Sequence, residues 1–135
     1  MEIVRGMCGG ASICFSIGTL ENGQIHDSVV ISIEEEDFLF IHFVVMKHYP
    51  SFDMYDLVNP ISASKLRQFI WELEAILEWM KTGKLHEFIS YYAEWLSTEK
   101  GIPSIEERIA FFEELVEYFH NLEQYDFDYL NLAGF

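Results

Sequence analysis

Apolar residues recur every three or four positions through the second half of this 135-residue chain, and this spacing is typical of amphipathic helices. In the first of these segments the apolar positions are Leu66, Phe69, Ile70, Leu73, Ile76, Leu77 and Met80. Ser62 or Ser64 could cap this helix and Gly83 could end it. The same spacing predicts helices over 85–96 and 105–122. Each helix must bury its apolar stripe against a second layer of structure.

The N-terminal third carries the alternating pattern of a β-strand. Ile13, Phe15 and Ile17 are separated by small or polar residues, which is the period of a half-buried strand. Asn22-Gly23 then supplies the residues that a tight hairpin turn requires. We therefore expect a second strand from about Gln24 to Ile33.

Two further segments leave alternatives open. The stretch from Phe38 to Met46 is apolar on all sides and fits a strand or a buried helix; the capping-box spacing of Ser32 and Glu35 favours the helix. Pro50 and Pro60 bound a loop over 51–59. The tail over 125–135 interleaves aromatic and acidic residues and predicts an edge strand or a docked extended segment.

These elements predict an α+β fold in a single domain over residues 1–135. We expect a small N-terminal antiparallel sheet, with its hairpin at Asn22-Gly23, packed against three or four α-helices. The length is sufficient to bury a core, and no linker or repeat divides the chain.

The helix expected over 63–81 has a second apolar face. Trp71, Ala75 and Trp79 lie opposite the Leu66 and Leu73 stripe, because successive helical residues rotate by about 100°. The favoured interpretation is a central helix with both tryptophans buried. The alternative is an exposed tryptophan pair that anchors a partner protein.

Charge restricts the function classes. The chain holds 23 acidic and 8 basic residues, for a net charge of −15, so nucleic acid and anionic membranes would repel it. The first residues lack the pattern of a signal peptide, and the apolar run from Phe38 to Met46 is too short to span a bilayer. We expect a cytoplasmic protein without cofactor, metal, membrane or direct nucleic-acid contact.

The acids of the predicted 105–122 helix are the most informative charges. Ser104 and Glu107 have capping-box spacing, and acids in a first turn need no other role. Glu113 and Glu117, four residues apart, repel each other at a cost of about 0.2–0.5 kcal/mol. Arg108 is the only base in the segment. A surface of one sign favours a partner that supplies the opposite sign.

The candidate partner-binding residues combine acids with aromatic side chains at the C-terminal end of the chain. They are Glu113, Glu114, Glu117, Glu123, Asp126, Asp128, Tyr125 and Tyr129. Acid with aromatic is the composition expected opposite a surface rich in Arg and Lys. Solubility alone is the alternative explanation of these acids. The other acidic cluster, over 34–37, falls where a helix begins and needs no binding role.

We therefore expect a small acidic protein that neutralises a basic protein partner. Among proteins of this physical type, a bacterial immunity protein or antitoxin that inhibits a nuclease-type toxin fits best. One alternative is a thiol-dependent hydrolase or transferase that uses Cys8 in the glycine-rich stretch over 6–12, although no histidine motif accompanies it. A second alternative is an adaptor or subunit of a larger complex, with Trp71 and Trp79 as its contact. The oligomeric state and the partner's identity stay open.

Overall fold

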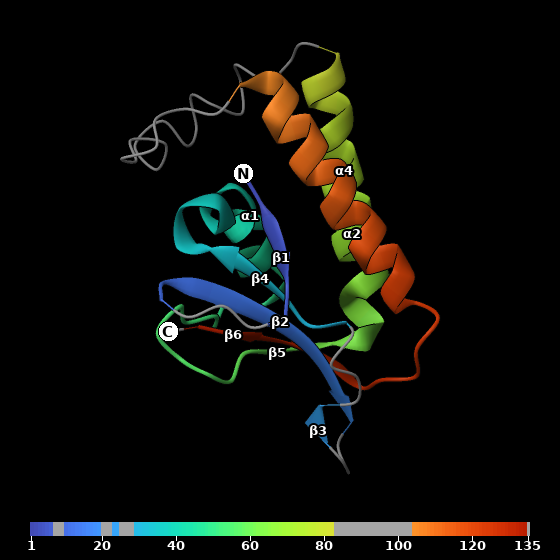
Figure 1. The fold of residues 1–135 in the computed structure, drawn as a ribbon. Helices are drawn as coiled ribbons and strands as arrows, with labels where there is room; N and C mark the ends of the chain where they lie inside the picture. Colours follow the sequence, from blue (N-terminus) through green and yellow to red (C-terminus); the bar gives the residue numbers. More distant parts are fainter. Residues whose placement is uncertain (7–9, 20–22, 25–28, 83–103, 135) are drawn as a thin grey trace.

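The computed structural model describes residues 1–6, 10–19, 23–24, 29–82 and 104–134, which form an antiparallel sheet and three α-helices (Figure 1). The strands are β1 (Ile3–Arg5), β2 (Ser12–Thr19), β3 (Gly23–Gln24), β4 (Ile31–Glu34), β5 (Pro60–Ser62) and β6 (Tyr129–Ala133). The helices are α1 (Glu35–His48), α2 (Leu66–Lys81) and α4 (Ile105–Leu122), with a 3₁₀ turn at Ala63–Lys65 before α2. The predicted α+β class is confirmed.

Strand β2 is the centre of the sheet. The strand order is β1-β4-β2-β6-β5, and β3 pairs with the far end of β2. All of these pairings are antiparallel, and Phe15 is opposite Ile31 on one side and Leu132 on the other. Strand β2 therefore lies between β4, from the N-terminal part of the chain, and β6, from its C-terminal end.

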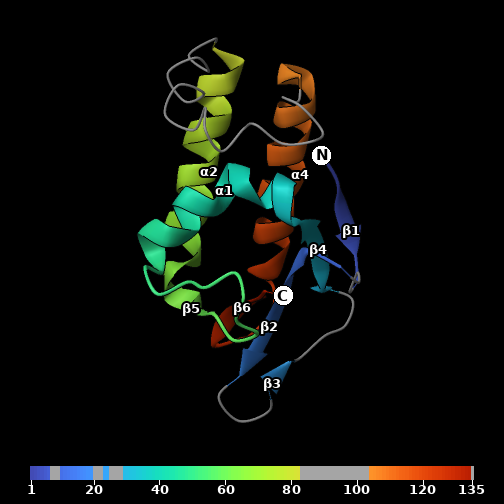
Figure 2. The same ribbon diagram turned by 90° about the vertical axis from the view of Figure 1, so that its left-hand side faces the viewer.

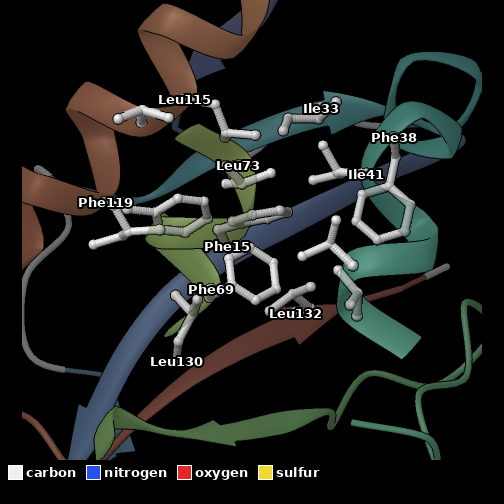
Figure 3. Close-up of a cluster of buried hydrophobic side chains, with 14 of the residues drawn as sticks. Phe15, Ile33, Phe38, Ile41, Phe69, Leu73, Leu115, Phe119, Leu130 and Leu132 are labelled. Atoms are coloured by element: carbon white, nitrogen blue, oxygen red, sulfur yellow. The ribbon is translucent and has the colours of Figure 1, made fainter. Parts of the chain in front are cut away.

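The alternation along β2 decides which face of the sheet is covered. Ile13, Phe15 and Ile17 are fully buried, whereas the intervening Cys14 and Ser16 are only half-buried. The buried residues face α1, α2 and α4, and Phe15 lies between Phe38 and Phe119 in Figure 3. The predicted half-buried strand is confirmed, and its covered face forms the core.

The ambiguous segment from Phe38 to Met46 is helical, as favoured, and lies within α1. The proposed capping box is wrong. Ser32 belongs to β4, and its hydroxyl donates to the Gly6 carbonyl oxygen at 2.6 Å, while Glu34 is the N-cap and makes no side-chain capping bond. Strand β4 runs directly into α1, so no polar turn separates them.

The sheet is not confined to the N-terminal part of the chain. The C-terminal tail forms β6, which pairs with β2 on one side and β5 on the other, so it is an interior strand and not an edge. Leu130 and Leu132 of β6 are buried. The acidic and aromatic residues that precede these leucines are typical of a surface segment, so the sequence predicted a peripheral tail.

The predicted hairpin is only partly visible. Gly18 pairs with Gln24 and Thr19 with Gly23, which brings the chain back beside β2, but Asn22 lies outside the described residues. The expected second strand from about Gln24 to Ile33 is not continuous, because Val29 and Val30 are outside any strand and β4 begins only at Ile31, while residues 25–28 lie outside the described residues. The predicted helix over 85–96 and its neighbour Gly83 also lie outside the described residues.

Helix α2 has one buried face, and the prediction that it is central is wrong. Leu66, Phe69 and Leu73 face the core, but Trp71 is 74% exposed and Trp79 is 48% exposed. Figure 1 shows α2 and α4 side by side at the right of the molecule, and Figure 2 shows α1 crossing in front of them. The second apolar face of α2 is therefore a surface feature. The predicted side-chain cap is also absent, since Lys65 is the N-cap and makes no such bond.

Arg108 is the largest polar side chain in the core. It is 2% exposed, and its guanidinium carbon lies 5.6 Å from the centre of the Phe40 ring. Its Nε and Nη1 atoms are buried and have no hydrogen-bond partner among the described residues, and burial lowers the pKa of the guanidinium. A charged group with unmade hydrogen bonds in the core is destabilising.

Replacing Arg108 by Met should therefore raise the free energy of unfolding by about 1–3 kcal/mol, because the unmade hydrogen bonds disappear and the stem volume is kept. Loss of the contact with Phe40 offsets part of this gain. Urea denaturation measures the difference. The exposed Arg67→Met serves as the control and should stay within about 0.5 kcal/mol of the parent. A clear loss of stability in Arg108→Met would contradict this account.

Candidate functional site

Helix α4 begins as the sequence predicted. The Ser104 hydroxyl oxygen accepts a hydrogen bond from the Glu107 backbone N–H at 3.2 Å. The Glu107 carboxylate lies 4.0 Å from the amino group of Met1. These contacts account for the first-turn acids locally, and they place the N-terminus of the chain beside α4.

The solvent side of α4 carries only acidic formal charge. Its five glutamates, Glu106, Glu107, Glu113, Glu114 and Glu117, are all exposed. Arg108, the only base that the sequence places among them, is withdrawn into the core. The surface of the helix is thus more acidic than its sequence suggests, with His120 as the only other titratable group on its exposed side.

Glu113 pairs with a lysine of the neighbouring helix. Its carboxylate lies 3.4 Å from the Nζ atom of Lys81 at the end of α2, and both side chains are about half exposed. An exposed pair of this kind contributes about 0–1 kcal/mol. It nevertheless occupies the carboxylate, so Glu113 is a weaker candidate for partner contact than Glu114 and Glu117.

A groove runs between α4 and the edge strand β1, and we call it the α4–β1 groove. Its volume is about 440 Å³. It is lined by Ile3, Arg5, Val29, Ile31, Glu114, Glu117, Tyr118, Asn121, Leu122, Gln124 and Tyr125. Apolar side chains from the sheet and α4 line part of it, while two carboxylates and two tyrosine rings lie on the helix side. Three predicted site residues, Glu114, Glu117 and Tyr125, meet here.

Tyr118 joins the two sides of the α4–β1 groove. Its hydroxyl donates to the Val29 carbonyl oxygen at 2.7 Å. Burial raises the pKa of Tyr118 above its usual range, and the nearby Cys14 adds a smaller electrostatic contribution in the same direction. The phenol therefore stays neutral and holds α4 against the segment that precedes β4.

A second groove lies between α2 and α4, and we call it the α2–α4 groove. Its volume is about 510 Å³, and it is lined by Arg67, Gln68, Ile70, Trp71, Glu74, His120 and Glu123. The His120 ring lies 2.8 Å from the Glu74 carboxylate through Nε2 and 3.8 Å from Glu123 through Nδ1. One predicted site residue, Glu123, is here beside the exposed ring of Trp71.

The remaining predicted residues line neither groove. Asp126 is exposed between α4 and β6. The Asp128 backbone N–H donates to the Gly18 carbonyl oxygen at 2.8 Å, and its carbonyl accepts from Ala63 at 2.9 Å. Tyr129 pairs with Gly18 across β2 and β6, and its ring fills the space that a Cβ at position 18 would need. Asp128 and Tyr129 thus have visible structural roles.

Sequence reasoning missed several residues that line the two grooves. Tyr118 follows Glu114 by four residues, so helical spacing already places them on one flank of α4. Trp71 was expected in the core and lies instead in the α2–α4 groove. No local sequence pattern marks Arg5, Val29 or Ile31 as groove residues, because only the pairing of β1 with β4 brings them beside α4.

The described residues include no metal site and no membrane-spanning helix. No three His, Cys, Asp or Glu side chains among them are grouped to hold a metal ion, and no described helix is long and apolar enough to cross a membrane. Cys8 lies outside the described residues, and Cys14 is half-buried in β2. No protein-family model, curated protein or solved structure matches this chain.

The raised pKa of Tyr118 predicts how stability changes in alkali. The unfolded chain releases this proton near pH 10.0, whereas the folded chain holds it to higher pH, so its contribution is complete below pH 10.0 and declines above it. Tyr118→Phe should therefore flatten the alkaline fall in the free energy of unfolding. At neutral pH the variant should lose about 0.5–1.5 kcal/mol, because the Val29 carbonyl loses its donor.

Urea denaturation from about pH 8 to about pH 11, a range that brackets the ordinary tyrosine pKa, measures both effects. Tyr55→Phe is the matched control, since Tyr55 is exposed. An unchanged alkaline slope in Tyr118→Phe would show that the phenol does not control this transition.

Proposed function

We propose that the chain is a binding protein that neutralises a basic protein partner, and that the two grooves flanking α4 are the contact surface. The observation that carries the proposal is the pairing of carboxylates with aromatic rings on both sides of one acidic helix. Glu114 and Glu117 accompany Tyr118 and Tyr125 in the α4–β1 groove. Glu74 and Glu123 accompany Trp71 in the α2–α4 groove.

This composition suits the side chains of Arg and Lys. Their charged groups can pair with a carboxylate, their stems can pack on apolar surface, and a guanidinium can stack on an aromatic face. The α4–β1 groove offers all three, because the half-buried Ile3 lines it together with the glutamates and the two tyrosines. A solubility role alone would not require these groups to converge.

Each groove also contains basic groups of its own, which limits the charge available to a partner. Arg5 lines the α4–β1 groove together with two glutamates, and Arg67 lines the α2–α4 groove together with Glu74 and Glu123. The formal charge of each groove is therefore −1 with His120 neutral. Attraction at longer range comes from the rest of α4 and from the net charge of −15.

A basic toxin domain is the partner class that we favour. An acidic surface of this kind would imitate the charge of nucleic acid, speed association with a cationic cleft and exclude the true substrate. An immunity protein or antitoxin directed against a nuclease-type toxin fits these demands and requires no chemistry from the chain. If so, the gene beside the one for this chain should encode a basic toxin.

The adaptor alternative has one specific observation in its favour, which is the exposure of Trp71 and Trp79 on α2. Trp71 lies in the α2–α4 groove, whereas Trp79 does not line it. An adaptor contact would therefore use the whole exposed stripe of α2, and a basic partner bound along α4 would use Trp71 alone.

Neutralising two groove acids tests the contact surface. Glu114→Gln with Glu117→Gln should weaken capture of the basic partner from a low-salt lysate of the host about tenfold or more, with folding unchanged. The matched control is Glu78→Gln with Glu106→Gln, since these acids are exposed and line neither groove. Both variants remove two charges. Equal loss in the two variants would mean that only net charge matters.

Trp71→Ala separates a binding role from a core role. Because the ring is 74% exposed, the substitution should change the free energy of unfolding by no more than about 0.5 kcal/mol. Affinity for the captured partner should fall by about 2 kcal/mol, the scale of an interface hot spot. Trp79→Ala should leave that affinity nearly unchanged if the contact follows α4. A larger loss of affinity in Trp79→Ala than in Trp71→Ala would favour the adaptor alternative.

A further inference from the structure

Three apolar side chains are exposed together on the loop that joins α1 to β5. Tyr55, Leu57 and Val58 are 73%, 67% and 64% exposed and fall within four residues. Single exposed apolar residues are common, but a cluster of this kind marks an interaction surface. We call residues 51–59 the 51–59 loop. It lies away from α4, at the lower left of Figure 1.

The backbone of this loop is fixed by one buried side chain, Asn59, which is 1% exposed. Its Nδ2 group lies 2.8–3.1 Å from the carbonyl oxygens of Asp53, Asp56 and Leu132, so that its two hydrogens serve three acceptors, with one hydrogen shared. Its Oδ1 atom accepts from the Asp53 backbone N–H at 2.9 Å. A single asparagine thus ties both ends of the loop to each other and to β6.

The C-terminal end of the chain holds the loop from the other side. The Gly134 N–H donates to the Asp56 carbonyl oxygen at 2.7 Å, and Asn131 Nδ2 donates to the Leu57 carbonyl oxygen at 3.1 Å. Gly134 packs so closely that a Cβ there would collide with the Met54 carbonyl. The exposed side chains therefore stand on ordered backbone, and binding through them would cost little further loop entropy.

Two aspartates give the apolar cluster an acidic rim. Asp53 and Asp56 are exposed, and one Oδ1 oxygen of each accepts a backbone N–H, from Tyr55 at 2.9 Å and from Val58 at 3.1 Å. These bonds hold the carboxylates close to the three apolar side chains. The complementary surface is an apolar pocket bordered by Lys or Arg.

Other occupants fit less well. A second copy of the chain in a two-fold contact would bring Asp53 and Asp56 against their own equivalents, with a charge of −15 on each molecule. An anionic membrane would repel the same carboxylates. Strand addition at the neighbouring edge is poor, because β5 has three residues and begins with Pro60.

We infer that the 51–59 loop is a second protein-binding surface, which inserts Tyr55, Leu57 and Val58 into an apolar pocket with a basic rim on a partner protein. This surface is separate from the two grooves beside α4. It does not depend on the function proposed for them.

The test uses the full chain in host cells with a photoreactive phenylalanine derivative in place of Leu57. The expected product is an adduct with a protein that is basic around the cross-linked site. The same derivative at Ser64, an exposed position outside the loop and both grooves, should give no such adduct. Asp53→Asn with Asp56→Asn should lower the adduct yield about tenfold, since the rim charge is lost.

The asparagine variants keep an acceptor oxygen for the Tyr55 and Val58 N–H groups, so the loop should retain its conformation, which a thermal melt checks. Glu114→Gln with Glu117→Gln should leave the adduct intact, which separates this surface from the α4 grooves. The inference is overturned by equal yields from positions 57 and 64, by an adduct with a second copy or with lipid, or by a yield insensitive to Asp53 and Asp56.

Discussion

The aromatic cluster around Phe15, which joins β2 to α1 and α4 and reaches α2 through Phe119, is the interaction on which the rest of the structure depends. The centre of the Phe15 ring lies 6.2 Å from the ring centre of Phe38 in α1. In α4, the ring centres of Tyr118 and Phe119 lie 6.4 and 6.0 Å from it. The Phe119 ring centre in turn lies 5.2 Å from that of Phe69 in α2 (Figure 3). Aromatic pairs at such separations add directional attraction to their burial. Because β2 is the central strand, this cluster sets where α4 lies relative to β1. It therefore determines the position of the α4–β1 groove.

The charged residues of α4 are not placed where they would make the fold most stable. The core holds Arg108, two of whose nitrogens have no hydrogen-bond partner in the described part of the chain, and the surface of the same helix carries five exposed glutamates. Replacing some of these charged residues by neutral ones would improve stability, since the glutamates repel one another and the arginine is desolvated. Features that lower stability at a surface are often retained for binding. The convergence of Glu114 and Glu117 with two tyrosines gives this acidity a defined place to act.

Local patterns predicted most of the elements but not how they meet. The alternation of Ile13, Phe15 and Ile17, the helix from Ser104 and the helix through Phe38 are all properties of neighbouring residues, and they are confirmed. The interior position of β6 depends on pairing across more than 100 residues, from Phe15 to Leu132, which no local pattern carries. The tryptophans were misplaced for a related reason. Helical spacing identifies two apolar faces on α2, but only the arrangement of the other elements decides that Trp71 faces solvent.

The central claim is that specific grooves beside α4, and not net charge, bind cationic side chains. Nuclear magnetic resonance titration of the isotope-labelled chain with N-acetyl-arginine amide tests it without an identified partner. The account predicts that shift changes concentrate at Glu114, Glu117 and Tyr125 and at the indole N–H of Trp71, and saturate together within each groove. Shift changes of equal size at the exposed Glu78 and Glu106, which line neither groove, would contradict it.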